Sequence, residues 1–240
     1  MQTNIRHVLG LVLFIVGLLL GQAVAVATFW PDLEANLFDQ SLAVEEKLDT
    51  LRCPVLLTRG ETGEISAEFS NALDRPISFF IRARISEGDI VAMRESQELL
   101  ELEVGETAVR RWDVAPGDAV YGSLVMARVT RLRRAPLPAG DQSCGILVLP
   151  FRGISGQVVL VVAILLSLGG MVAGALLWAQ GKRPLRARNR SQAITMSFIT
   201  GLIILDVIVS LAGLWALGLF ILVVTFLLLG AMLDRILPRR

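Results

Sequence analysis

The chain has 240 residues, of which 54% are hydrophobic and 19% are charged, and its mean hydropathy is +0.63. This balance lies outside that of ordinary soluble domains and indicates an integral membrane protein. The formal net charge is +1, and no part of the charge pattern calls for a nucleic acid. Residues 31–152 hold 14 basic and 20 acidic residues, whereas the rest of the chain holds 9 basic and 2 acidic ones. The middle and the flanks therefore face different surroundings.

The first apolar stretch, Val8 to Trp30, contains no charged residue and is long enough to cross a bilayer as a helix. We expect residues 1–30 to form a transmembrane helix that serves as a signal anchor. Small residues at A-x-A spacing within residues 23–27 leave a cleavable signal peptide open as the alternative. Gly17 and Gly21 form a small-residue ridge, which is a candidate face for helix packing or a lipid-facing stripe of no consequence.

Three more spans are expected near the C-terminus. The second covers residues 153–179, and its Gly170 and Gly174 form another candidate packing face. Between residues 193 and 232 the only charged residue is Asp206, and one helix of this length would measure about 60 Å, twice the hydrocarbon thickness of a bilayer. Residues 193–233 must therefore form a helical hairpin, and Gly213 and Gly218 mark its turn.

The distribution of basic residues predicts the orientation. The segment 180–192 is a short basic loop and the tail 234–240 is basic, so both are expected in the cytoplasm, together with the N-terminus. Residues 31–152 are then extracytoplasmic. The basic side chains of the loop could also hold anionic lipid headgroups, although their role in topology accounts for them without it. They are Lys182, Arg183, Arg186, Arg188 and Arg190.

The extracytoplasmic segment has two parts. Residues 31–52 carry leucines at roughly helical spacing and predict a juxtamembrane helix. Within residues 53–152, short alternating runs separated by turn residues predict seven strands, at 55–58, 64–70, 77–85, 98–104, 108–114, 123–129 and 145–149. Seven short strands are typical of an immunoglobulin-like sandwich. The predicted fold class is a membrane protein of α+β type, with an extracytoplasmic Ig-like β-sandwich and four transmembrane helices, one N-terminal and three C-terminal.

Residues 53–149 resemble bacterial Ig-like domains of the CARDB and NEW3 kind. The residues that carry the resemblance are Gly60-Glu61-Thr62 before one strand, Asn71 after it, Arg75-Pro76-Ile77, Gly105-Glu106-Thr107 and Trp112-Asp113-Val114. The resemblance implies a spacer or binding module near a membrane or cell surface. It implies no shared active site.

Cys53 and Cys144 stand just before the predicted first and last strands. In Ig-like folds a first-strand segment can pair in parallel with the last strand, which would bring the two cysteines within reach of a disulfide. An oxidising compartment favours that bond. Two reduced, buried thiols are the alternative.

The segment between the last two predicted strands is a candidate partner-binding loop. Its residues Arg131, Arg133 and Arg134 precede Pro136 and Pro138, so a basic stretch is stiffened by two prolines. Loops carried on a rigid sandwich often bind partners, here an acidic protein surface or an anionic polymer. The alternative is a solvated connection whose arginines balance an acidic domain.

Asp206 is the second candidate, because a carboxyl in the middle of a span is costly unless it is protonated, paired or turned into a bundle. Ser210 lies on the same helical face. The pair is either structural, in an interhelical hydrogen bond or a subunit contact, or part of a proton or ion path.

Catalysis finds little support in the sequence. The only histidine, His7, lies on the expected cytoplasmic side, and no metal-ligand cluster or phosphate-binding glycine loop is present. We therefore expect no enzyme, no cofactor and no metal. The favoured hypothesis is a non-enzymatic binding or accessory subunit of a cell-envelope membrane complex. The alternative is a small transporter or channel-like subunit built around Asp206, and a surface hydrolase with a spatially formed carboxylate pair is a third.

Overall fold

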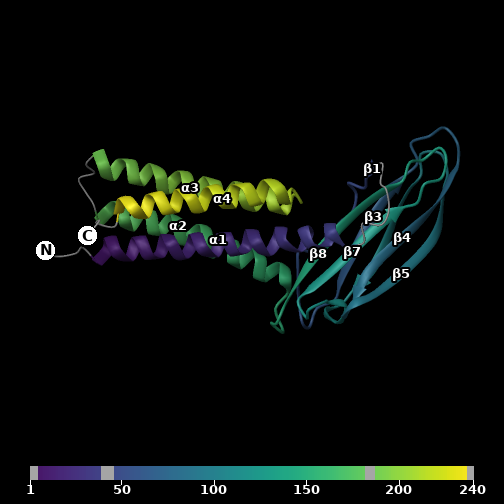
Figure 1. The fold of residues 1–240 in the computed structure, drawn as a ribbon, viewed down its shortest axis with the longest axis horizontal. Helices are drawn as coiled ribbons and strands as arrows, with labels where there is room; N and C mark the ends of the chain where they lie inside the picture. The colour runs from purple at the N-terminus through teal and green to yellow at the C-terminus, as the bar shows by residue number, and fades with distance from the viewer. Residues whose placement is uncertain (1–4, 39–45, 182–186, 237–240) are drawn as a thin grey trace. The chain divides into compact units, whose positions relative to one another are not determined.

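The computed structural model describes residues 5–38, 46–181 and 187–236. The chain divides into two compact units. One unit consists of residues 1–29 and 159–240, and the other consists of residues 30–158. The fold is α+β, with long apolar helices in the first unit and a sheet-rich domain in the second (Figure 1).

The helical unit is built from α1 (Ile5–Leu37), α2 (Gly156–Gly181), α3 (Ala187–Leu211) and α4 (Trp215–Ile236). Among the described residues, these four helices are long and apolar enough to cross a membrane. Figure 1 shows them running side by side within this unit. All four contribute buried side chains to one hydrophobic cluster, for example Phe14 from α1, Trp178 from α2, Ile199 from α3 and Leu229 from α4.

The helical hairpin bends where the sequence predicted it. α3 ends at Leu211 and α4 begins at Trp215, and Gly213 lies between them with a φ of +73°. Glycine adopts this left-handed conformation without the steric cost that a Cβ imposes. The other predicted turn residue, Gly218, lies inside α4.

The basic loop is shorter than the expected range 180–192. α2 continues to Gly181 and α3 begins at Ala187, because the segment 187–192 is composed largely of residues that are compatible with a helix. Of the basic residues considered for lipid binding, Lys182, Arg183 and Arg186 lie outside the described residues, whereas Arg188 and Arg190 belong to α3.

The second unit contains two sheets. The larger sheet has the order β1-β8-β7-β4-β5, and β2 also pairs with β8. Its strands are β1 (Glu46–Lys47), β2 (Leu56–Thr58), β4 (Ile77–Glu87), β5 (Asp89–Leu102), β7 (Leu124–Arg131) and β8 (Gly140–Leu149). The smaller sheet pairs β3 (Gly63–Ser70) with β6 (Thr107–Val114) in antiparallel fashion. The first strands β1 and β2 run parallel to the last strand β8, as the Ig-like resemblance implied.

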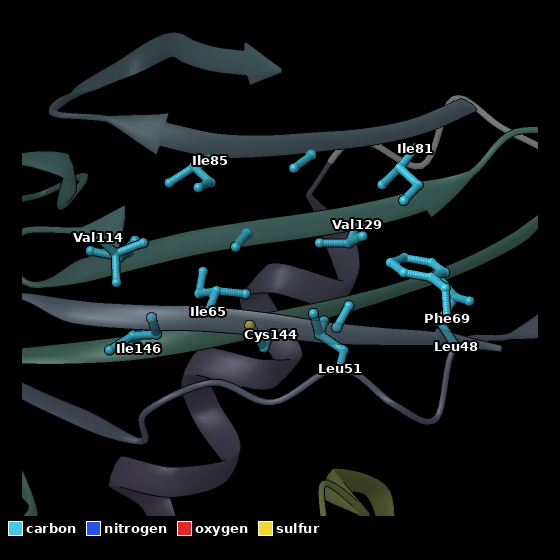
Figure 2. Packing of buried hydrophobic residues seen from close by; sticks show 14 of the residues in the cluster. Leu48, Leu51, Ile65, Phe69, Ile81, Ile85, Val114, Val129, Cys144 and Ile146 are labelled. Carbon is cyan, nitrogen blue, oxygen red and sulfur yellow. The ribbon is translucent and has the colours of Figure 1, made fainter. Parts of the chain in front are cut away.

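Both sheets contribute to one hydrophobic core. Alternating residues of β4, such as Phe79 and Ile81, are buried together with Ile65 and Phe69 of β3 and Val129 of β7. Figure 2 shows side chains from these strands gathered in the cluster. This alternation is the period of two that a strand with one buried face produces.

The predicted helix over residues 31–52 is wrong for its second half. Residues 31–37 continue α1, residues 39–45 lie outside the described part of the chain, and residues 46–47 form β1. The amide of Leu48 donates to the carbonyl of Asp141 on β8, and the side chains of Leu48 and Leu51 enter the core of the sheet-rich unit. The spacing of these two leucines therefore does not indicate a helix. They are buried in the core although the segment that carries them is not helical.

Two strands begin five or more residues earlier than predicted. β5 starts at Asp89, directly after a turn at Gly88 with a φ of +70°, so its first nine residues were missed. β8 starts at Gly140, which places Cys144 inside the strand rather than before it. The connection between β7 and β8 is correspondingly reduced to residues 132–139.

Candidate functional site

Cys53 and Cys144 form a disulfide with a Cα–Cα distance of 6.5 Å. Cys53 precedes β2 by three residues, and β2 pairs in parallel with β8, so the two cysteines meet at the seam between the first and last strands. The bond links residues 91 positions apart. It fixes the strand that leads toward α2 against the segment that follows β1.

The candidate partner-binding loop forms a defined turn at one end of the larger sheet. Arg134 and Leu137 exchange backbone hydrogen bonds of 2.8 and 3.3 Å and so close the turn around Pro136. A cavity of about 300 Å³ lies between this turn and the segment that opens β4. Its lining residues are Arg75, Pro76, Ile77, Ser78, Arg134, Ala135, Pro136 and Leu137. The loop and the Arg75-Pro76-Ile77 motif, which are far apart in the sequence, thus form one site.

The arginines of the loop have different roles. Arg131 belongs to β7, forms an ion pair with Glu46 (Nη2–Oε2 2.6 Å) and donates from Nε to the carbonyl of Pro138 (3.3 Å). Its side chain links β1 to β7, so its hydrogen-bonding groups are engaged within the chain. Arg133 and Arg134 are exposed, and Arg134 is the loop arginine that lines the cavity.

The two arginines that line the cavity are Arg75 and Arg134, and both are exposed. Within the described residues neither forms an ion pair, whereas Arg82, Arg94 and Arg111 of the same domain each have a carboxylate partner. In a domain with more acidic than basic residues, two unpaired guanidinium groups at one cavity form a local positive site.

Two motif residues of the resemblance have structural roles. Asn71 is buried, its Nδ2 donates to the carbonyls of Arg75, Leu102 and Glu103, and its Oδ1 accepts from the amide of Leu73. Its side chain therefore holds the segment after β3 beside the end of β5. Glu61 accepts hydrogen bonds from the amides of Thr58 and Gly156, and the latter bond, at 2.7 Å, caps the start of α2.

The end of α1 packs closely on β8 within the sheet-rich unit. Asp32 lies two residues beyond the apolar stretch that ends at Trp30, and its Oδ1 accepts from the amide of Gly145 at 3.1 Å. A Cβ at Gly145 would overlap the backbone of Pro31, so only glycine permits this approach. Burial raises the pKa of Asp32 above its usual value, while the Gly145 hydrogen bond and the charge of Lys47 act in the opposite direction.

The predicted packing glycines lie where helices of this chain approach one another closely. A Cβ at Gly17 would lie 2.7 Å from the backbone of α2, at Met171 N, and one at Gly174 would lie 2.5 Å from Phe14 N of α1. Gly170 lies against Gly17, and the hydroxyl of Ser167 donates to the carbonyl of Gly17 at 2.7 Å. Gly21 faces Ser167 and Ile203. The small-residue faces of α1 and α2 are thus occupied by each other.

Asp206 belongs to a buried polar cluster that draws on three helices. Gln22 of α1 donates from Nε2 to Oδ2 of Asp206 at 3.5 Å, and Ser210 lies one turn further along α3. The exposed fractions are 0% for Asp206, 2% for Ser210 and 3% for Gln22. Gly218 of α4 completes the cluster, because a Cβ there would lie 2.8 Å from Ser210 Oγ and 3.4 Å from Asp206 Oδ1.

The sequence analysis missed Gln22. The signal that could have identified it is its amide, which is the largest polar side chain within the uncharged stretch from Val8 to Trp30. A polar side chain in a span usually faces another polar group, because hydrocarbon offers it no partner.

In the part of the chain that the structure describes, no group of three or more His, Cys, Asp or Glu side chains is placed to hold a metal ion. The described residues form two polar sites: an arginine-lined cavity in the sheet-rich unit and a buried cluster of Gln22, Asp206 and Ser210 in the helical unit.

No known protein family and no curated protein matches this chain. Solved structures match part of it. Bacteroides uniformis β-glucuronidase matches with 13% identity and a TM-score of 0.28, over 39% of this chain and 12% of the enzyme. Paenibacillus cycloisomaltooligosaccharide glucanotransferase matches with 11% identity and a TM-score of 0.32, over 44% and 14%.

A CARDB domain from Pyrococcus furiosus, solved with di-metal ions, matches with 10% identity and a TM-score of 0.31. The match covers 40% of this chain and 83% of that domain, so the family that the sequence resembles is among the structural matches. The chain spans only about an eighth of the first matched enzymes. Likenesses at these scores assign neither a family nor an activity to the chain.

Proposed function

We propose that this chain is a membrane-anchored, non-enzymatic binding or accessory subunit of a cell-envelope complex, and that its Ig-like β-sandwich is the binding module. The module takes an acidic partner at the cavity between the β7–β8 turn and the start of β4. The observation that carries the proposal is the pair of exposed arginines, Arg75 and Arg134, that line this cavity without carboxylate partners in the described residues.

Shape and charge both support this site. The turn that bears Arg134 is closed by backbone hydrogen bonds to Leu137, so the arginine starts from a fixed backbone and loses less entropy on binding. A guanidinium group suits carboxylate and phosphate recognition, because its donors match two oxygen atoms at once. The cavity of about 300 Å³ would admit one or two side chains or a sugar unit of an anionic polymer.

The proposed topology places residues 31–152 outside the cytoplasm and both termini inside. The disulfide between Cys53 and Cys144 supports it, because such bonds persist in oxidising compartments. The helices support it as well, since large apolar side chains such as Leu165, Phe220 and Leu227 are more than 60% exposed on their outer faces, as contact with lipid requires.

The test combines complex size with charge reversal. The full chain is recovered from mildly solubilised membranes as wild type, as the Arg75→Glu/Arg134→Glu double variant and as an Arg59→Glu control. Arg59 is exposed and does not line the cavity. We expect wild type and control to be recovered in a stoichiometric complex that is lost in the double variant. Raised salt should weaken the complex, because exposed charge pairs are screened.

Two results would contradict the proposal. One is a wild-type chain that is recovered alone under the mildest solubilisation. The other is a complex that survives the double reversal unchanged, which would move the contact away from the cavity. Wild type and the double variant should show the same urea midpoint, because both substituted side chains are exposed.

A second candidate function is a small transporter or channel-like subunit. The observation that favours it is the burial of Asp206 with Gln22 and Ser210 among three of the apolar helices. The Asp206→Asn variant separates the two functions. Retained partner assembly together with lost ion or solute flux in reconstituted vesicles would assign the function to the helices.

A further inference from the structure

One end of the larger sheet carries exposed aromatic side chains. β7 and β8 run antiparallel, so the turn that precedes β7 lies beside the end of β8 (Figure 1). The amide of Val148 donates to the carbonyl of Ser123 at 2.7 Å and joins the two segments. Tyr121 in the turn is 71% exposed, and Phe151, two residues beyond β8, is 52% exposed. Both aromatic residues therefore lie at the same end of the sheet.

Tyr121 occupies a backbone position that does not suit an aromatic residue. Its φ is +54° and that of Gly122 is +67°, and the amide of Ser123 donates to the carbonyl of Val120 at 3.2 Å. This is the pattern of a type I′ turn, whose first central position favours asparagine, aspartate or glycine. Among the described residues, Tyr121 is the only residue other than glycine with a positive φ. The turn itself does not call for tyrosine, so the exposed ring points to a contact outside the chain.

The chain passes from this end of the sheet directly into α2. Residues 151–154 are all exposed, and the helix begins at Gly156. The hydroxyl of Thr58 on β2 donates to the carbonyl of Ile154 at 2.8 Å, and Glu61 accepts from the amide of Gly156 at 2.7 Å. These bonds hold the first residue of α2 beside the sheet. Because α2 is long and apolar enough to cross a membrane, the exposed segment before it adjoins the place where the chain enters lipid.

We propose that Tyr121, Phe151 and Ile154 insert into the headgroup region of the leaflet that α2 enters. Arg152, which follows Phe151, binds a phosphate group of the same lipids. The proposal rests on the membrane anchoring in the proposed function. Aromatic rings are favoured at the boundary between membrane and water, where tyrosine keeps its hydroxyl in water and its ring in the apolar region. A guanidinium group donates two hydrogen bonds to a phosphate at once.

The lipid contact also sets the height of the arginine-lined cavity. β7 and β8 lead away from Tyr121 and Phe151 to the turn 132–139, which carries Arg134. β7 has 8 residues, which at about 3.3 Å per residue span roughly 25 Å. With the aromatic end of the sheet fixed at the lipid headgroups, the module holds its cavity at about that distance from them. The soluble part of a partner subunit can then approach the cavity without entering lipid.

The test measures the depth of single labelled positions. Both cysteines of the chain form the disulfide, so one added cysteine accepts a fluorescent label at a chosen position. The full chain with Tyr121→Cys or Phe151→Cys is reconstituted in vesicles of phosphatidylcholine and phosphatidylglycerol. The matched control is Val104→Cys, because Val104 is also exposed and apolar but follows the end of β5, which pairs with the start of β4 at the opposite end of the sheet.

We expect the labels at positions 121 and 151 to lose most of their emission to lipids that carry a doxyl group near the headgroup, and little to aqueous iodide. The label at position 104 should show the reverse. In the chain labelled at position 151, Tyr121→Ser should weaken the quenching by lipid, because it removes the other ring. Arg152→Glu should weaken the quenching of the label at position 121, because a carboxylate repels the lipid phosphates.

A label at Leu227→Cys separates this proposal from the membrane anchoring, because Leu227 is exposed on α4. Quenching by lipid at position 227 but not at positions 121 and 151 would overturn the lipid contact and leave the anchoring intact. An absence of lipid quenching at all three positions would contradict the anchoring as well. Labels at 121 and 151 that neither lipid nor iodide quenches would overturn the proposal in favour of a protein contact, with a second copy of this chain as the partner.

Discussion

The close contact between α1 and α2 makes a sharp prediction about Gly174. A Cβ at this position would lie 2.5 Å from Phe14 N and 2.7 Å from Gly10 O, and both are backbone atoms that no rotamer change can move. The neighbouring Gly169 lies on the same helix and has no atom within 4 Å of its Cβ position. Gly174→Ala and Gly169→Ala therefore make the same chemical change in a crowded and an open place.

The two substitutions are expected to change the free energy of unfolding in opposite directions. Alanine is favoured over glycine within a helix by about 1 kcal/mol, and Gly169→Ala should gain up to that amount. Gly174→Ala receives the same gain but must separate the helices by roughly 1 Å to reach an ordinary contact distance, which overpacking costs put at about 1 to 3 kcal/mol. The separation also weakens the bond from Ser167 Oγ to Gly17 O, worth about 0.6 kcal/mol in a membrane.

The assay is equilibrium unfolding of the full chain in mixed micelles, with both variants and wild type in parallel. We expect Gly169→Ala to be at least as stable as wild type and Gly174→Ala to be less stable than Gly169→Ala by about 1 to 3 kcal/mol. Gly17→Ala should behave like Gly174→Ala, because its Cβ would meet Ser167 O and Met171 N at 2.7 Å. Equal stability of the two alanine variants would refute the close contact between α1 and α2.

Three further predictions concern the sheet-rich unit. Reduction of the Cys53–Cys144 bond should lower the free energy of unfolding of the full chain in urea, by at most about 4 to 5 kcal/mol for a link of this span, and an unchanged free energy would contradict a bond that constrains the unfolded chain. Asn71→Ala should cost about 2 to 4 kcal/mol by thermal unfolding, because it leaves several buried backbone groups unpaired, and a loss below 0.5 kcal/mol would speak against that role. Burial raises the folded-state pKa of Asp32 above 3.8, so the folded state binds more protons at this group just above that pH, and the contribution of Asp32 to stability falls there as pH rises. The wild-type urea midpoint should therefore fall relative to that of Asp32→Asn over this pH range, and parallel pH curves for the two proteins would exclude the shift.

Element types were predictable where one face of a segment is buried. The strands β3 and β4 alternate between core and surface, and that alternation is visible in the sequence. β5 escaped prediction because it is the edge strand of the larger sheet, and its residues 93–99 are exposed on both faces. With neither face buried, its first half lacks the period of two that marks a strand.

Contacts across long stretches of sequence were not predictable from local patterns. Gln22 and Asp206 are 184 residues apart, and no local pattern in either segment indicates that the two side chains meet. Arg131 illustrates the converse, because its place in a basic stretch suggested a binding residue, while the fold pairs it with Glu46. A charged residue shows its role only once its neighbours in space are known.

The glycine faces of α1 and α2 pack against each other, and this changes where a partner can bind. Gly17 and Gly174 were candidates for contact with another subunit, but each faces the backbone of the neighbouring helix of this chain. A partner that packed against these glycines would have to displace α1 from α2. The exposed arginines at the cavity, Arg75 and Arg134, need no such displacement. Under the proposed function, a subunit that binds without unpacking this chain is expected at the sheet-rich unit, and charge reversal there is the more direct test of partner binding.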